Sequence, residues 1–249
     1  MTEVSVIMPV FNGEKFIKDA IKSVAIQNVP VKLIVVNDCS TDKSVEIVKQ
    51  CKNEFDNPKI TLVDLHQNKG VAYCRNLAIK MADTKYVAFL DCDDIWLSGK
   101  LAQQLEILKK NDANICCTAR ELIDFNGKTT GKIIAPEKCI TYNSMLIHNS
   151  IAMSSAIIKT EIAKKFTMQS GNFHEDYIFW LDVLKQHTNA IGLSEVYTNY
   201  RLNQNSKSGN KIKSAKMHYN SLLKHGVNPI KAIFLFVVYA FFGVINHKL

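Results

Sequence analysis

The segment Tyr86-Val87-Ala88-Phe89-Leu90-Asp91-Cys92-Asp93-Asp94 joins a short apolar run to three aspartates within four positions. The run 86–90 has the length and residue types of a buried strand. Ligands of open α/β sheets gather outside the carboxyl ends of the strands, so the aspartates are expected in such a crevice. Clustered carboxylates repel one another, which indicates a hard divalent ion such as Mg²⁺ or Mn²⁺ shared with substrate phosphates. The alternative is a solvated acidic turn that caps the next helix.

Strand and helix patterns alternate around this segment, throughout the first 110 residues. Predicted strands cover 4–8, 33–36, 60–65 and 86–90, and apolar residues at helical spacing follow each of them. This order predicts an α/β fold, with a mainly parallel sheet and helices on both faces. Beyond residue 112 the periodicity weakens, and a strand at 115–123 and a helix at 175–185 are expected there.

Length and composition are those of a folded protein with one domain, or one domain and an appendage. The chain has 249 residues, of which 47% are hydrophobic and 22% charged. None of its seven cysteines forms a Cys-x-x-Cys pair, so we expect reduced thiols in a cytosolic protein. The amino terminus leads directly into a strand-like run, and we expect no export signal.

The carboxyl-terminal third is basic and ends in an apolar run. The net charge is +8, and residues 230–245 are almost wholly apolar, with lysines on both sides. As a helix this run rises about 24 Å, less than the roughly 30 Å of a hydrocarbon core. We therefore expect an interfacial anchor on an anionic membrane surface, with a buried core helix or a homodimer face as the alternative. Nucleic acid is not an expected partner, because outside this tail no aromatic stacking residues interleave with the lysines.

Polar groups follow each predicted strand at the edge where the aspartates lie. They are Pro9-Val10-Phe11-Asn12, Asn37-Asp38-Cys39-Ser40-Thr41-Asp42, Asn68-Lys69-Gly70 with Arg75-Asn76, and the aspartate cluster. Any one of them is explained by turn or capping chemistry. All four at one edge of one sheet indicate a ligand site.

With the strands that precede them, these segments resemble the motifs of the family 2 glycosyltransferases. The resemblance implies the GT-A fold and inverting transfer of a sugar from a nucleotide sugar. Motifs at 4–96, with further matches near 175 and 201, extend it over about four fifths of the chain. We expect a GT-A domain at 1–210, with a nucleotide-binding half at 1–110 and an acceptor half at 111–210. Residues 211–249 would form a basic and then apolar helical segment that associates with a membrane.

The resemblance assigns the donor nucleotide to the first three polar groups. Asp38 would accept hydrogen bonds from the uracil or ribose, and Arg75 would pair with a phosphate or with the aspartates. Cys39 stands where the family usually has glycine, and since cysteine does not easily take positive φ, a local difference in the turn is expected. The other expected donor-binding residues are Pro9, Phe11, Asn12, Asn68 and Gly70, with Phe11 packing beside the base.

By the same resemblance, the last polar group holds the metal. Asp93 would bind Mn²⁺ or Mg²⁺ directly and Asp91 would assist it or contact the ribose, while Asp94 would cap the next helix. The metal would neutralise charge on the departing nucleoside diphosphate. A Glu-Asp pair within 173–181 matches the family's base motif, so Asp176 is expected to be the general base and Glu175 its partner. The alternative is that both carboxylates merely favour the positive end of a helix.

Three further residues receive expected roles. Arg201 would clamp the diphosphate beneath a loop that runs through Ser208. Trp96 would line the acceptor entrance, whereas Trp180 is expected in the core.

The expected function is metal-dependent, inverting transfer of a hexosyl or N-acetylhexosaminyl group, with UDP-sugar as the favoured donor. The acceptor would be a saccharide or lipid-linked saccharide of a bacterial envelope polysaccharide or lipopolysaccharide, at the cytoplasmic face of the inner membrane. A nucleotidyltransferase is the rival enzyme, but residues 9–14 lack its Gly-rich basic loop. An inactive nucleotide-sugar-binding partner of another transferase is the other alternative, against which Asp93 and Asp176 both argue.

Overall fold

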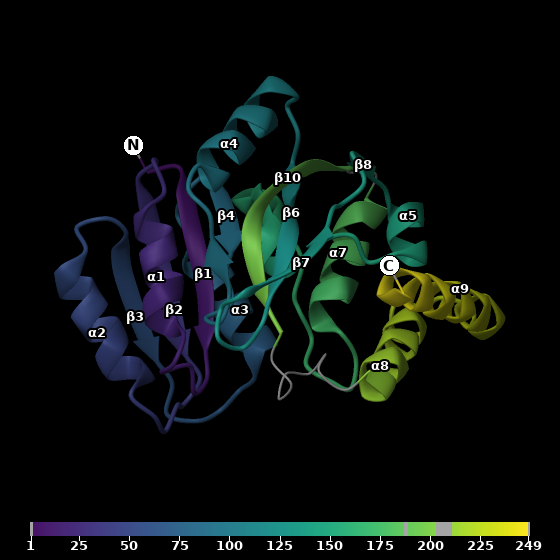
Figure 1. Ribbon diagram of the computed structural model, residues 1–249, viewed down its shortest axis with the longest axis horizontal. Coiled ribbons are helices and arrows are strands. Elements are labelled where there is room, and N and C mark those ends of the chain that lie inside the picture. The colour runs from purple at the N-terminus through teal and green to yellow at the C-terminus, as the bar shows by residue number, and fades with distance from the viewer. Residues whose placement is uncertain (1, 187–188, 203–210, 249) are drawn as a thin grey trace.

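The computed structural model describes residues 2–186, 189–202 and 211–248, and these form a single large sheet with helices packed on it (Figure 1). The strands are β1 (Val4–Val10), β2 (Val31–Asn37), β3 (Lys59–Asp64), β4 (Tyr86–Phe89), β5 (Ile95–Trp96), β6 (Ile115–Ile123), β7 (Thr129–Ile134), β8 (Cys139–Ile140), β9 (Ala156–Lys159) and β10 (Ala190–Arg201). The helices are α1 (Ile17–Ala25), α2 (Ser44–Glu54), α3 (Val71–Met81), α4 (Lys100–Lys110), α5 (Tyr142–Ile147), α6 (Thr160–Ala163), α7 (Glu175–Lys185), α8 (Lys211–Lys224) and α9 (Pro229–Lys248), with a short 3₁₀ turn, η1 (Met153–Ser155).

The first half of the sheet is parallel, as the alternation of strands and helices predicts. The order β3-β2-β1-β4 pairs each strand with parallel neighbours, and every residue of β1 is buried. β1 continues through Pro9 to Val10, with Pro9 in register with Val36. The carboxyl ends of β1, β2 and β4 therefore meet at one edge, where the polar groups emerge.

The second half is mixed because β9 runs against both of its neighbours. β9 lies between β4 and β6 and is antiparallel to each, while β10 is parallel to β6. β5 leaves the first half of the chain and pairs with the end of β10. The predicted strand at 115–123 and helix at 175–185 coincide with β6 and α7.

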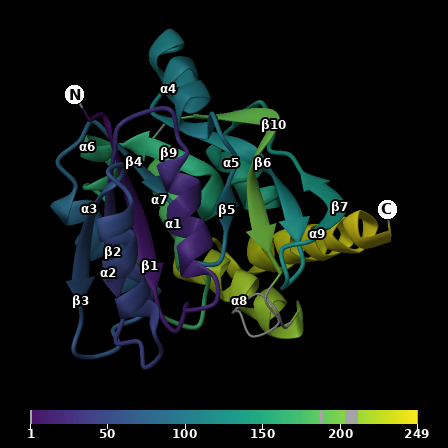
Figure 2. The same ribbon diagram turned by 60° about the vertical axis from the view of Figure 1, so that its left-hand side comes forward.

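Two apolar layers cover the faces of the sheet. One joins α1, α2 and α4 to the strands, and the other joins α3, α5 and α7. Figure 2 shows α1 in front of the sheet and α7 behind it. Trp180 is fully buried in the second layer, as expected. The prediction for Trp96 is wrong: its ring is 0% exposed, and its indole N–H donates to the Ser154 carbonyl at 2.7 Å.

The carboxyl-terminal helices α8 and α9 lie at the side of the molecule opposite β3 (Figures 1 and 2). α8 packs on α7, and α9 packs on α5 and α8. Leu222, Ala232 and Leu235 join the apolar layer around α7. In the part of the chain that the structure describes, no helix combines the length and apolar character needed to cross a membrane. The loop expected through Ser208 lies outside the described residues.

Candidate functional site

A cleft of about 340 Å³ opens at the carboxyl edge of the parallel strands. The predicted site residues that line it are Pro9, Phe11, Asp38, Arg75, Asp91, Asp93, Glu175, Asp176 and Arg201. They come from the ends of β1, β2, β4 and β10 and from α3 and α7, so segments far apart in the sequence meet here. Asn12, Asn68 and Gly70 are not in its lining.

Asp38 is held by the loop that precedes α3. Its two carboxylate oxygens accept backbone N–H bonds from Lys69 at 2.6 Å and Gly70 at 2.9 Å. The Asn68 amide donates to the Asp38 carbonyl at 3.2 Å, and Gly70 takes a φ of 83°. Asn68 and Gly70 thus orient Asp38, whose carboxylate retains lone pairs for a ligand.

Asn12 and Cys39 shape the neighbouring loops. The Asn12 side-chain oxygen accepts the backbone N–H of Thr41 at 2.9 Å, which ties the end of β1 to the loop after β2. Cys39 adopts a φ of 62°, in the left-handed region, and its thiol lies 3.6 Å from the His66 carbonyl. The expectation that cysteine avoids positive φ here is therefore wrong.

Arg75 is the central cation of the cleft. It is 4% exposed, and its guanidinium donates to Asp91 at 2.6 Å and to Glu175 at 3.2 Å. Burial opposes the charge, but Asp91 and then Glu175 raise the Arg75 pKa above its ordinary value. The sequence predicts that Arg75 pairs with a phosphate or with the aspartates, and in the structure it pairs with Asp91.

The three aspartates differ in environment. Asp94 is 1% exposed and accepts the backbone N–H of Arg201 at 2.9 Å. Burial, together with the charges of Asp93 and Asp91, raises the pKa of Asp94 well above its usual range. The expectation that Asp94 caps the next helix is wrong, because α4 begins after Gly99.

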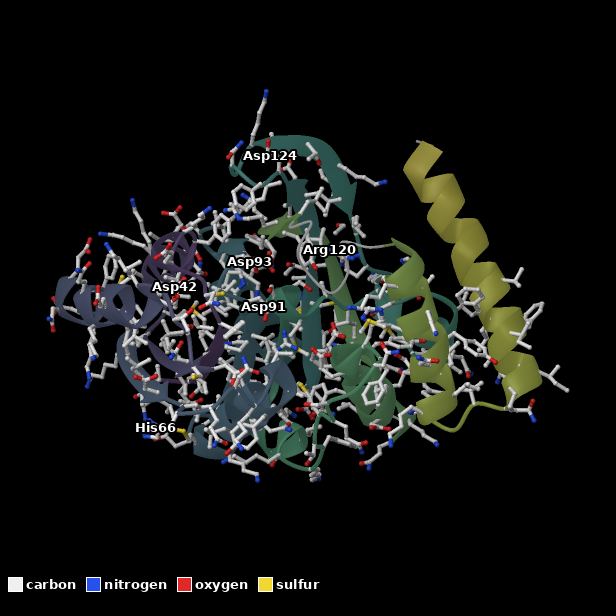
Figure 3. The ribbon with its side chains drawn as sticks, turned by 90° about the horizontal axis from the view of Figure 1, so that it is seen from below. Asp42, His66, Asp91, Asp93, Arg120 and Asp124 are labelled. Atoms are coloured by element: carbon white, nitrogen blue, oxygen red, sulfur yellow. The ribbon has the colours of Figure 1, made fainter. Side chains whose placement is uncertain are left out.

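The cluster fits a divalent cation shared with a substrate. Asp91 and Asp93 both face the cleft (Figure 3), and one buried oxygen of Asp94 has no hydrogen-bond partner among the described residues. Within those residues no group of three or more His, Cys, Asp or Glu side chains is arranged to hold a metal by itself. Mg²⁺ is commonly held by one or two carboxylates with substrate phosphates completing its shell, and Mn²⁺ takes the same oxygen donors. The donor set thus suits a metal that arrives with a diphosphate.

Glu175 and Asp176 open α7 at the cleft. Glu175 is 7% exposed and ion-paired with Arg75, whereas Asp176 accepts the backbone N–H of Tyr177 at 2.8 Å. Burial, and next the charge of Glu175, raises the pKa of Asp176, while Arg75 partly offsets them. A carboxylate of raised pKa is a stronger proton acceptor than one at its ordinary pKa, which suits Asp176 to take up a proton.

Arg201 links three loops. Its Nε donates to the Asp93 carbonyl at 2.8 Å and one terminal nitrogen to the Phe125 carbonyl at 2.9 Å. The guanidinium carbon lies 4.5 Å from the centroid of the Phe16 ring. These contacts hold the loop that carries Asp93 against the β6–β7 hairpin, and the diphosphate clamp expected of Arg201 stays a prediction.

The motifs do not reveal Ser154. Its hydroxyl accepts the backbone N–H of Asp91 at 3.1 Å, and its carbonyl accepts the indole N–H of Trp96. Through these two hydrogen bonds η1 stabilises the loop that carries the aspartates. Ser154 follows no recognisable strand and lies 63 residues from Asp91, so no local signal points to it.

Solved structures define the class of the fold. A Staphylococcus aureus TarS fragment in complex with UDP-GlcNAc matches with a TM-score of 0.72 and 21% identity, over 94% of this chain and 70% of that one. The mannosyltransferase PcManGT of Pyrobaculum calidifontis, in complex with GDP-Man and Mn²⁺, matches with a TM-score of 0.70 and 18% identity, over 95% and 68%. The fold is that of the GT-A glycosyltransferases.

Sequence comparison gives the family. The chain belongs to glycosyl transferase family 2, whose family model matches residues 5–170. The Escherichia coli UDP-Glc:alpha-D-GlcNAc-diphosphoundecaprenol beta-1,3-glucosyltransferase WfgD is 34% identical over 98% of this chain and 94% of its own. The putative teichuronic acid biosynthesis glycosyltransferase TuaG of Bacillus subtilis is 35% identical over 95% and 94%. The chain is therefore a glycosyltransferase, and the nucleotidyltransferase alternative is wrong.

Proposed function

We propose that this glycosyltransferase moves a hexosyl or N-acetylhexosaminyl group from a UDP-sugar to a lipid-linked, diphosphate-bearing saccharide in bacterial envelope polysaccharide synthesis. The observation that carries the proposal is the meeting of Asp176 with Asp91, Asp93 and Arg75 in one cleft. Two carboxylates that could bind a metal, Asp91 and Asp93, thus line the same cleft as Asp176, whose pKa is raised. The name of WfgD supports the donor and acceptor classes, and the name of TuaG supports a role in envelope polysaccharide synthesis.

The donor would lie along the ends of β1, β2 and β4. Phe11, which is 52% exposed at the rim, offers a face for the base beside Pro9. Asp38, oriented by its two backbone donors, would accept from the ribose or uracil. Asp93, with Asp91 in support, would hold Mn²⁺ or Mg²⁺, which when bound supplies positive charge against the diphosphate.

Asp176 would carry the proton of the reaction. Its carboxylate takes the proton of an acceptor hydroxyl while that oxygen forms a bond to the anomeric carbon. The bond between this carbon and the diphosphate oxygen breaks, and its electron pair leaves with the nucleoside diphosphate. A single displacement inverts the anomeric centre. Glu175, fixed by Arg75, would orient the acceptor and keep the pKa of Asp176 raised.

Helix α9 would dock the enzyme on a membrane. Four apolar side chains at helical spacing form an exposed stripe, with exposed fractions of 80%, 55%, 66% and 59%, and they are Ile230, Ile233, Phe234 and Val237. The opposite side of the helix, at Ala232 and Leu235, is buried. The exposed lysines of α8 and α9, namely Lys213, Lys216, Lys224 and Lys231, suit anionic headgroups. A lipid-linked acceptor would then be met at the surface where it resides.

The test is transfer by the purified full chain. UDP-glucose, UDP-GlcNAc and GDP-mannose are each offered with a GlcNAc-diphosphate lipid, with Mn²⁺ and after chelation. We expect product with a UDP-sugar only, with inverted anomeric configuration, and loss of product on chelation. Donor binding without transfer to any saccharide would favour the inactive-partner alternative, and activity that survives chelation would refute the metal.

A further inference from the structure

The chain has three arginines, Arg75, Arg120 and Arg201. Arg75 and Arg201 line the cleft, and Arg120 is within electrostatic range of Asp94 and Asp176, which also line it. Its many lysines are spread over the rest of the sequence. Arginine recognises phosphate through a planar, bidentate fork that lysine lacks. Arg75 already forms ion pairs with Asp91 and Glu175, and Arg201 donates hydrogen bonds to backbone carbonyls. Arg120 is the third member of this set, and no motif points to it.

Arg120 is a half-buried residue of β6. It is in register with Thr198 of β10, and its guanidinium lies 5.9 Å from the ring centroid of Tyr200, which lines the cleft. Among the described residues, no carboxylate lies within the 4.0 Å of an ion pair with Arg120. A cation removed from water without a contacting anion is unfavourable, so the site favours an anionic ligand there.

Its electrostatic surroundings place Arg120 at the cleft. Burial lowers the pKa of Arg120, while Tyr200 and, less strongly, Asp94 and Asp176 act in the opposite direction. Asp176 and Asp94 are therefore within electrostatic range of this guanidinium. Arginine stays protonated at all relevant pH values, so its charge is permanent.

The position of β6 distinguishes the two phosphates that Arg120 could meet. The donor diphosphate belongs with Asp91 and Asp93, at the end of β4, whereas β6 lies beyond β9 in the acceptor half. Arg120 is within electrostatic range of Asp176, the proposed base, which must face the acceptor hydroxyl, as well as of Asp94.

We propose that Arg120 binds a phosphate group of the acceptor and so makes a phosphorylated, lipid-linked saccharide the preferred substrate over a neutral glycoside. This inference rests on the proposed function, because it assumes that Asp176 acts on the acceptor. Arg120 is a specificity-determining residue in this scheme, and it takes no part in the proton transfer.

The experiment compares the full-length protein with Arg120→Gln and Arg120→Lys on two acceptors. One is a GlcNAc-diphosphate alkyl lipid, and the other is a neutral GlcNAc alkyl glycoside of equal chain length. For Arg120→Gln we expect KM for the diphosphate acceptor to rise about 10- to 100-fold, the loss typical of a charge-assisted hydrogen bond. KM for the neutral glycoside, KM for the donor and the slow hydrolysis of the donor should not change. Arg120→Lys should recover part of the loss, and Lys128→Gln, on the exposed hairpin, serves as the charge-matched control.

Binding of the diphosphate lipid is also measured by calorimetry in the presence of UDP, with thermal melting to verify the fold. A wild-type protein that binds this lipid through Arg120 but transfers no sugar would refute the proposed function, while the phosphate contact of Arg120 would remain supported. Equal losses on both acceptors would overturn the assignment of Arg120 to the acceptor phosphate. A rise in KM for the donor alone would also overturn it and would assign Arg120 to the donor diphosphate. Unchanged kinetics and binding in Arg120→Gln would overturn it as well.

Discussion

Arg75 Nη1 lies 3.2 Å from Glu175 Oε1, across 100 positions of sequence. The second terminal nitrogen of the same guanidinium lies 2.6 Å from Asp91. One buried cation therefore joins the aspartate cluster of the cleft to the helix that carries the proposed base, and it neutralises carboxylates from both halves of the chain.

Removal of Arg75 should be costly for stability. In Arg75→Gln, Asp91 and Glu175 are left without their cation, and we expect a loss of about 3–5 kcal/mol in the free energy of unfolding. Arg75→Lys keeps the charge and should lose less. Urea denaturation measures both, with Lys18→Gln as the control, since the Lys18–Glu54 pair is exposed to solvent and should contribute little to stability. Equal small effects in Arg75→Gln and Lys18→Gln would contradict the central role of Arg75.

Asp176→Asn should abolish turnover and spare donor binding. Loss of a general base typically costs about 10²- to 10⁴-fold in rate. The hydrogen bond that Asp176 accepts comes from Tyr177 in its own helix, away from the proposed donor residues. Single-turnover transfer measures the first effect and UDP calorimetry the second. If UDP affinity falls together with the rate, Asp176 belongs to the donor site instead.

The pH profile should report the raised pKa of Asp176. A base must be deprotonated, so kcat should fall as pH drops through this pKa, which lies above the ordinary 3.8 of aspartate. Because the charge of Glu175 raises it, Glu175→Gln should move the acid limb of kcat to lower pH. A limb that moves upward in this variant would assign the titration to another group.

Asp93→Asn should remove the extra stability that Mn²⁺ gives to the protein when UDP is bound. With both ligands at about 100 times their dissociation constants, the wild-type protein should gain about 2.7 kcal/mol or more in stability, and the variant should keep only what UDP supplies alone. Thermal melting with each ligand singly and with both gives the comparison, and Asp56→Asn at an exposed position is the control. A variant that responds fully to Mn²⁺ would place the metal elsewhere.

The stripe on α9 should bind anionic membranes. Ile233→Gln with Phe234→Gln should reduce co-sedimentation with phosphatidylglycerol vesicles, while the melting temperature stays unchanged, because both side chains are exposed. Ile133→Gln, at an exposed apolar residue of β7, is the matched control. If the double variant instead turns a dimer into a monomer, as judged by light scattering, α9 is a dimer face.

The parallel half of the sheet and most of the cleft follow from local sequence. Apolar runs of strand length end in Asp38 and Asp91, and parallel strands bring such ends to one edge whatever the loops do. The fit of 175–185 to α7 has the same origin, since a helical period and two acidic residues in its first turn are local signals.

Other parts depend on contacts that no local pattern carries. β9 is four residues long, so its place between β4 and β6 is decided by tertiary pairing alone. The burial of Trp96 depends on Ser154, and the hydrogen bonds of Arg201 depend on a hairpin more than 70 residues away. In the sequence Arg120 is an ordinary strand residue, and only the pairing of β6 with β10 brings its guanidinium near Tyr200.

The pairing of β5 with β10 has a consequence for engineering. Because a strand from the first hundred residues closes the sheet beside the last strand, a chimera spliced near residue 110 would bring together β5 and β10 from different parents. The bonds Trp96–Ser154, Arg201–Asp93 and Arg75–Glu175 would all cross that junction. Exchange of acceptor halves between relatives should therefore require these partners to be transplanted as a set.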